Sequence, residues 1–243
     1  MRLRLEVEYD GTDFCGWQRQ LTGPTVQATI EDALAQMIGK ECRIQGAGRT
    51  DAGVHALGQV AHLDLDTKIP LRGLRLGLNS RLPTAISIRR VAEVAPDFDA
   101  RRSAISKLYR YQIWNGENRA PTRDRFVWQL RRGLEVEAMR SAAQRLVGRH
   151  DFAAFRAADC ERRTTVRTLR RLDVVRQGEL VLVEVEAEAF LKNMVRILCG
   201  TLVELGAGKL SSADIQRILD GKDRTQAGPT APACGLALVC VRY

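Results

Sequence analysis

Residues 2–9 read RLRLEVEY, and after a turn-rich stretch residues 26–38 read VQATIEDALAQMI. In the first segment every second residue is apolar, which is the pattern of a strand with one buried face. In the second segment apolar residues recur at helical spacing, and Gly39 supplies a stop. A strand followed by an amphipathic helix predicts an α+β fold.

The same alternation continues along the chain. Strands are predicted near residues 60–65, 86–94, 109–113 and 236–242, and helices at residues 71–81, 139–147, 191–205 and 211–221. Residues 165–176 and 180–189 are two β-rich runs joined by a turn with Gly178, which predicts an antiparallel hairpin. Pro96 and a basic run mark a boundary near residues 100–106. We therefore predict two similar α+β domains, 1–103 and 104–243, each with a mixed, mainly antiparallel sheet and flanking helices.

Composition excludes several classes of protein. Of the 243 residues, 45% are hydrophobic and 28% are charged, which is typical of a globular chain. The apolar stretches are far shorter than a membrane span, and the N-terminus lacks the apolar core of a signal peptide. Six scattered cysteines in a chain of this length do not suggest a disulfide framework. We expect a cytoplasmic protein with no membrane contact.

The positive charge is concentrated in the middle of the chain. The net charge is +9, and residues 101–175 hold 18 basic and 8 acidic residues. Most of these cations are arginines, whose planar guanidinium groups suit phosphate. A polyanionic partner is the natural inference. The alternative is a solvated surface that only keeps the protein soluble.

Residues 46–56, GAGRTDAGVHA, are the densest candidate for a functional site. Glycines allow close approaches, so a carboxylate in such a loop can be presented to a bulky ligand. Asp51 is that carboxylate, and a carboxylate can act as nucleophile or base. The alternative is that Asp51 bonds its own turn or caps a helix. The loop lacks a complete dinucleotide or Walker fingerprint and the spacing of a calcium loop.

The spacing of histidines and cysteines argues against a metal site. His55, His62 and His150 are isolated, and the chain has no Cys-x-x-Cys pair. A zinc finger or zinc deaminase therefore has little support, and we expect no metal. Each histidine is expected to be structural or to contact RNA.

Two further residues are candidates for binding. Tyr109 lies in the basic and aromatic run at residues 107–111, where an exposed ring could stack on a nucleobase, although the alternation by itself favours the core face of a strand. Arg196 lies four residues after Lys192 on an apolar helix. Like charges at that spacing repel, so the pair favours an acidic partner or a phosphate. Glu184, Glu186 and Glu188 are the structural partners, and Asp51 is the functional one.

Taken together, these segments resemble the TruA-type tRNA pseudouridine synthases. The resemblance spans the chain, and six motifs in the family's order carry it: Tyr9-Asp10-Gly11-Thr12 with residues 16–20 (GWQRQ), residues 48–56 (GRTDAGVHA), Tyr109-Arg110-Tyr111, His150-Asp151-Phe152 with Phe155-Arg156, Met194-Val195-Arg196, and Asp223-Arg224-Thr225. The chain departs from the family pattern at Leu108 and at residues 191–193.

The resemblance implies the pseudouridine synthase fold with ferredoxin-like halves. It also implies isomerisation of uridine to pseudouridine at positions 38, 39 and 40 in the tRNA anticodon stem-loop, without cofactor or metal. By the same resemblance Asp51 is the catalytic carboxylate, and it attacks the ribose or the base or removes a sugar proton. Tyr109 stacks on the target, Arg196 partners the carboxylate, and Arg49 helps to hold the nucleotide flipped out. A homodimer is implied as well.

A non-catalytic basic RNA-binding protein is the main competing interpretation. Such a protein would keep the basic surface and the tyrosines but would not depend on Asp51. A methyltransferase or deaminase is disfavoured, because the chain lacks the glycine fingerprint and the metal ligands.

Overall fold

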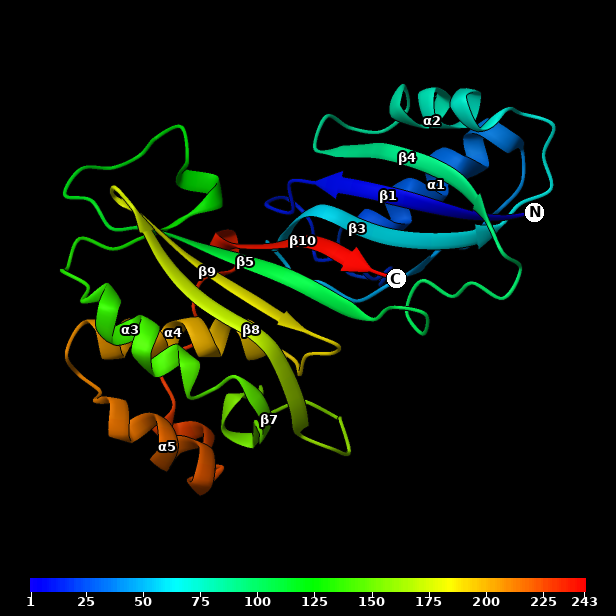
Figure 1. The fold of residues 1–243 in the computed structure, drawn as a ribbon. Helices are drawn as coiled ribbons and strands as arrows, with labels where there is room; N and C mark the ends of the chain where they lie inside the picture. Colours follow the sequence, from blue (N-terminus) through cyan, green and yellow to red (C-terminus); the bar gives the residue numbers. More distant parts are fainter. The chain divides into compact units, whose positions relative to one another are not determined.

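The computed structural model describes all residues from Met1 to Tyr243. The chain forms two compact units, which are coloured along the sequence in Figure 1. The first contains Met1–Ile105 and Ala237–Tyr243, and the second contains Ser106–Leu236. The C-terminal residues thus make their contacts in the first unit, whereas the predicted division at 103/104 groups them with the second half.

The sheet of the first unit is built around β1 (Arg2–Tyr9). This strand pairs antiparallel with both β3 (His55–Asp64) and β4 (Ile86–Val94). On its other side β3 pairs in parallel with β10 (Leu236–Arg242), and the short β2 (Gln45–Gly46) is antiparallel to β3. The period-two pattern of β1 is confirmed, because its apolar side chains are buried, namely Leu3, Leu5, Val7 and Tyr9.

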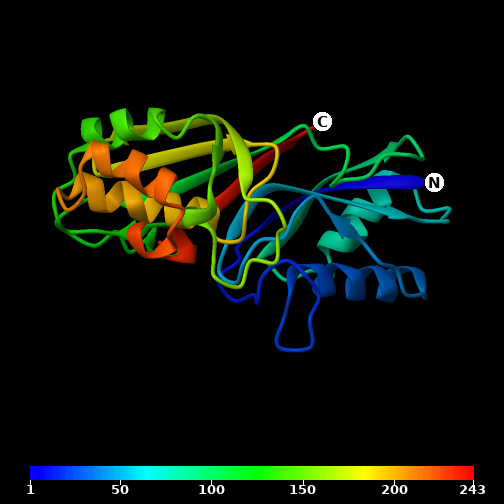
Figure 2. The same ribbon diagram turned by 90° about the horizontal axis from the view of Figure 1, so that it is seen from below.

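Two helices complete the first unit, and their ends follow ordinary capping chemistry. In α1 (Val26–Ile38) the Thr25 side chain accepts the Ala28 N–H, and Gly39 ends the helix at φ 72°. The second helix, α2 (Leu71–Asn79), packs against β4 and α1. The stretch before α1 extends as a loop in Figure 2.

The second unit has a four-stranded antiparallel sheet in the order β5-β9-β8-β7. Its strands are β5 (Ser106–Trp114), β7 (Gly148–Asp151), β8 (Val166–Gln177) and β9 (Leu180–Ala187). A two-residue β6 (Trp128–Gln129) pairs in parallel with β5. The predicted hairpin is confirmed, because β8 and β9 pair antiparallel across a turn in which Gly178 has φ 62°.

Three helices belong to the second unit. They are α3 (Val136–Gln144), α4 (Met194–Gly206) and α5 (Ser212–Gly221). Helix α3 packs against β8, α4 and α5, and α4 contacts β5. The capping residue predicted for α5 is confirmed, since the Ser211 N–H donates to the Asp214 carboxylate at 2.7 Å. Short 3-10 turns occur at Asp124–Phe126, Ala153–Phe155, Arg224–Gln226 and Ala233–Gly235.

Predicted helix ends in α2, α3 and α4 are wrong. Helix α2 ends at Asn79 instead of Arg81, and α3 begins at Val136 instead of Met139. Helix α3 stops at Gln144 instead of Val147, and Gly148, at φ 105°, begins β7 instead of ending the helix. Helix α4 begins at Met194 instead of Leu191, because Asn193 has the left-handed φ of 60° and breaks the helical path. The α+β class itself is confirmed in both units. None of the helices combines the length and the hydropathy that crossing a bilayer requires.

Candidate active site

Asp51 lies in the first unit on the connection between β2 and β3, and it is partly exposed. The backbone is hydrogen-bonded on both sides of this residue. The Trp17 N–H donates to the Thr50 carbonyl at 3.1 Å, and the Val54 N–H donates to the Asp51 carbonyl at 3.1 Å. The Gly53 N–H donates to the Phe14 carbonyl at 3.3 Å. The carboxylate is therefore carried by a main chain whose position is fixed from two directions.

Two glycines outside the loop allow the segment at residues 10–17 to lie against it. A Cβ atom on Gly16, which has φ 93°, would lie 2.6 Å from the Thr50 carbonyl oxygen. A Cβ on Gly11 would lie 2.0 Å from the Val54 carbonyl oxygen. The sequence points to the glycines of the loop itself, and this role of Gly11 and Gly16 is evident only in the structure. Their place in the motif formed by residues 9–12 and 16–20 is the signal that the sequence offers.

A buried pair of hydroxyl groups, from Tyr9 and Thr50, supports the loop that carries Asp51. The Tyr9 hydroxyl and Thr50 Oγ1 are 2.7 Å apart, and both side chains are buried. The fully buried Gln59 donates from Nε2 to the Gly48 carbonyl at 2.9 Å. Burial raises the pKa of Tyr9 far above its usual value, so its hydroxyl stays neutral. These contacts link β1 and β3 to the residues that precede Asp51.

Replacing Thr50 with valine is expected to lower the rate of the reaction proposed below about tenfold and to cost about 1–3 kcal/mol of stability. The hydroxyl removed is hydrogen-bonded to the buried Tyr9 hydroxyl, and loss of a buried hydrogen bond carries a cost of that size. Single-turnover kinetics and urea unfolding measure the two effects. Thr50→Ser keeps the hydroxyl and is the matched control. An unchanged rate for Thr50→Val would show that the pair does not position the loop.

The three histidines each bond the main chain. Nδ1 of His55 accepts the Gly11 N–H at 3.0 Å, and Nδ1 of His62 accepts the Ala100 N–H at 3.1 Å. Nε2 of His150 lies 3.0 Å from the Val147 carbonyl oxygen. The expectation of structural histidines therefore agrees with these contacts. No group of three or more His, Cys, Asp or Glu side chains is arranged to hold a metal ion.

Arg49 is also in the first unit, two residues before Asp51. Its side chain is exposed and forms no ion pair in the structure. A guanidinium that is not committed to a carboxylate keeps its donors for an anionic ligand. Asp51 and Arg49 are thus presented by the same short loop.

Tyr109 and Arg196 belong to the second unit. Tyr109 lies on β5, is 8% exposed, and meets the Phe190 ring edge-on with 5.2 Å between ring centroids. It shares one strand face with Tyr111 and Ile113, which are fully buried. The packing around Tyr109 is that of a strand's inner face, and it also holds the ring in a single orientation.

Arg196 is held in the first turn of α4 by its own unit. Its Nε donates to the Ala231 carbonyl at 2.7 Å, and its Nη1 donates to Asn193 Oδ1 at 3.2 Å. Lys192 Nζ pairs with the Asp159 carboxylate at 2.5 Å. Of the acidic residues on β9, Glu184 pairs with Arg110 and Arg171.

The segment at residues 227–232 is fitted closely to α4. A Cβ on Gly200 would lie 1.8 Å from the Pro229 carbonyl oxygen, so only glycine fits there. Arg224 donates to the Gly228 carbonyl at 2.9 Å and to Thr230 Oγ1 at 3.2 Å. Burial lowers the pKa of Arg224 from its usual value. The motif at residues 223–225 therefore supports the segment that Arg196 also binds, a role that the sequence did not reveal.

Comparison with known proteins places these residues in a known context. The model of a family described as tRNA pseudouridine synthase matches residues 6–101 and 142–243. A tRNA pseudouridine synthase A from Geobacter sp. (strain M21) is 48% identical over 242 residues, covering 99% of this chain and 98% of that protein. A protein of the same name from Citrifermentans bemidjiense is 48% identical over 99% of this chain and 97% of its own length. One from Methylobacterium nodulans is 46% identical, with coverages of 100% and 96%.

Proposed function

Because the chain belongs to the tRNA pseudouridine synthase family, we propose that it isomerises uridine to pseudouridine at positions 38, 39 and 40 of the tRNA anticodon stem-loop. The observation that carries this proposal is the setting of Asp51. Its backbone is hydrogen-bonded on both sides, and its side chain is partly exposed. A carboxylate held in this way is preorganised for a reaction at a bound nucleotide.

The reaction rearranges bonds within one nucleotide. The N-glycosidic bond from N1 of uracil to C1′ of the ribose breaks, the base turns, and a bond forms from C5 to C1′. The proton on C5 leaves to solvent and N1 gains a proton, so no oxidant or reductant is consumed. The Asp51 carboxylate attacks the ribose, attacks the base, or removes a sugar proton. In each route a carboxylate oxygen must lie beside the sugar.

Three other side chains are assigned to substrate binding. A uridine in or beside a stem must be extruded, which costs a few kcal/mol. Stacking on the Tyr109 ring contributes about 1–3 kcal/mol toward that cost. Arg49, on the Asp51 loop, helps to hold the extruded nucleotide, and Arg196, in the first turn of α4, is assigned as the partner that keeps the Asp51 carboxylate oriented and ionised.

Tritium release tests this function directly. Stem-loops are prepared with [5-³H]uridine at position 38, 39 or 40, each with cytidine at the other two positions. The expected result is release from all three substrates, because each isomerisation exchanges the C5 proton. Release from none of them would favour the non-catalytic RNA-binding protein.

Binding of tRNA is expected to weaken steeply with salt. The basic excess of residues 101–175 implies contacts with several phosphates. With about six contacts, affinity falls about 10³-fold between 50 and 200 mM salt, because bound counterions are released from the RNA. Filter binding over that range measures the slope. A flat profile would mean that this basic region does not contact the RNA backbone.

We further propose that the protein acts in the cytoplasm and that it acts as a homodimer. In this dimer both subunits line one basic cleft that binds a single tRNA. Sedimentation equilibrium measures the mass of the free protein. A monomer of 27.1 kDa at all concentrations would contradict the dimer.

A further inference from the structure

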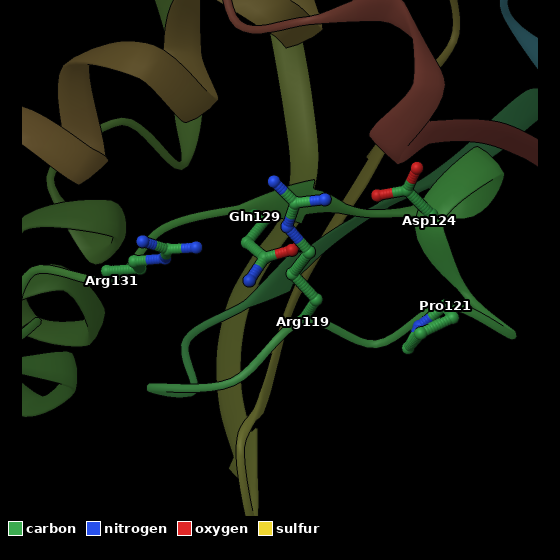
Figure 3. A pocket seen from close by; sticks show the side chains of 5 residues that line it. All are labelled: Arg119, Pro121, Asp124, Gln129 and Arg131. Atoms are coloured by element: carbon green, nitrogen blue, oxygen red, sulfur yellow. The ribbon is translucent and has the colours of Figure 1, made fainter.

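A hollow of about 660 Å³ lies in the second unit, on the connection between β5 and α3. It is lined by Arg119, Pro121, Asp124, Gln129 and Arg131 (Figure 3). All of these residues lie in the stretch 102–141, which the family model leaves unmatched. We call this hollow the arginine pocket.

Hydrogen bonds to Trp114 of β5 hold the backbone next to Arg119 and Arg131 in place. Trp114 Nε1 donates to the Asn118 carbonyl at 2.9 Å, and Gln129 Nε2 donates to the same carbonyl at 3.2 Å. The Leu130 N–H donates to the Trp114 carbonyl at 2.8 Å. These bonds fix the residues immediately before Arg119 and Arg131. The pocket walls are therefore preorganised although they belong to a long connection.

The charges in the pocket are not neutralised in pairs. Arg119 and Arg131 are exposed and form no ion pair, whereas the neighbouring Arg132 pairs with Glu204 at 2.6 Å. Asp124 is the single acid in the lining. In Figure 3 the Arg119 guanidinium lies between Gln129 and Asp124, with Arg131 on the far side of Gln129. Two guanidinium groups with uncommitted donors favour one phosphate group.

We propose that the arginine pocket binds a phosphodiester group of the tRNA backbone. Arg119 and Arg131 donate to the phosphate oxygens, and Gln129 contributes its remaining amide hydrogen. Pro121 offers an apolar surface to the adjoining ribose. With two arginines and the Asp124 carboxylate the lining has a net charge of +1, which matches the single negative charge of one phosphodiester. This inference rests on the proposed function, because that function supplies the tRNA.

The double variant Arg119→Gln/Arg131→Gln tests the pocket in the full-length protein. Filter binding with intact tRNA at about 0.1 M salt is expected to show an affinity loss of about tenfold, which corresponds to one charge-assisted contact. The plot of log affinity against log salt has a negative slope, and this slope is expected to become shallower by about one. The matched control is Arg72→Gln/Arg90→Gln, which removes the same charge from exposed positions in the first unit that form no ion pair. That control is expected to bind tRNA with nearly wild-type affinity.

The possible outcomes separate this inference from the proposed function. An equal loss of tRNA affinity in both double variants would show that the effect comes from net charge alone, and it would overturn the proposal that the pocket binds a phosphate of the RNA. A pocket variant with wild-type affinity and slope, in a protein that releases tritium, would overturn the pocket alone. Pocket-dependent binding without tritium release from any substrate would overturn only the proposed function. Weaker binding of inorganic phosphate by the pocket variant, with unchanged tRNA affinity, would assign the pocket to the free anion instead of RNA.

Discussion

Asp51→Asn is expected to abolish tritium release while the variant still binds tRNA. The amide has nearly the same shape as the carboxylate, but it is neither basic nor nucleophilic. Loss of a group that acts on the reacting atoms typically lowers turnover by about 10⁴-fold or more. Single-turnover release with the labelled stem-loops measures this loss, and filter binding measures the affinity. Asp51→Ala is expected to behave in the same way.

Asp66→Asn is the charge-matched control for Asp51. Asp66 is an exposed acid in the same unit, just after β3, and forms no ion pair. Its variant is expected to turn over at the wild-type rate. Retained turnover in purified Asp51→Asn would refute the assignment of this carboxylate and with it the mechanism.

Tyr109→Leu is expected to lower turnover severely, by about 10- to 100-fold. Removal of the ring removes a stack worth about 1–3 kcal/mol on the extruded base. The variant also loses the edge-on contact with Phe190, so its stability falls as well. Tritium release is therefore compared per folded molecule, with the folded fraction taken from thermal unfolding followed by circular dichroism.

Tyr111→Leu makes the same substitution two residues further along β5. Tyr111 is fully buried and its hydroxyl donates to the Pro232 carbonyl at 2.8 Å, so this variant is also expected to be less stable. Its turnover per folded molecule is expected to stay near the wild-type value. If both variants lose activity only in proportion to their folded fraction, Tyr109 is a core residue and not a stacking residue.

Elements with a strong local period were predictable from the sequence. Strand β4 and strand β10 occupy the predicted residues, and α1 spans the apolar pattern between Thr25 and Gly39. The period of a strand or helix is a property of neighbouring residues, so no tertiary contact is needed to recognise it. Strands β2, β6 and β7 have two to four residues and were not predicted, because so short a run shows no period.

Helix ends depended on contacts that the sequence does not display. Gly148 was expected to end α3, but it begins a strand that pairs with β8. The register of that pairing joins residues about twenty positions apart, such as Gly148 and Leu169. A glycine is compatible with both roles, so the neighbouring strand decides between them.

The candidate site divides in the same way. By its own composition and family resemblance, the sequence determined the α+β class, the basic middle of the chain, and Asp51 on a glycine-rich loop. Only the tertiary structure decided that the Tyr9 hydroxyl supports Thr50, and that Gly11 and Gly16 allow residues 10–17 to lie against the Asp51 loop. The tertiary structure also decided that Arg119 and Arg131 line one pocket. The physical reason is that composition and periodicity act between chain neighbours, whereas hydrogen bonds and close packing act between atoms that folding brings together.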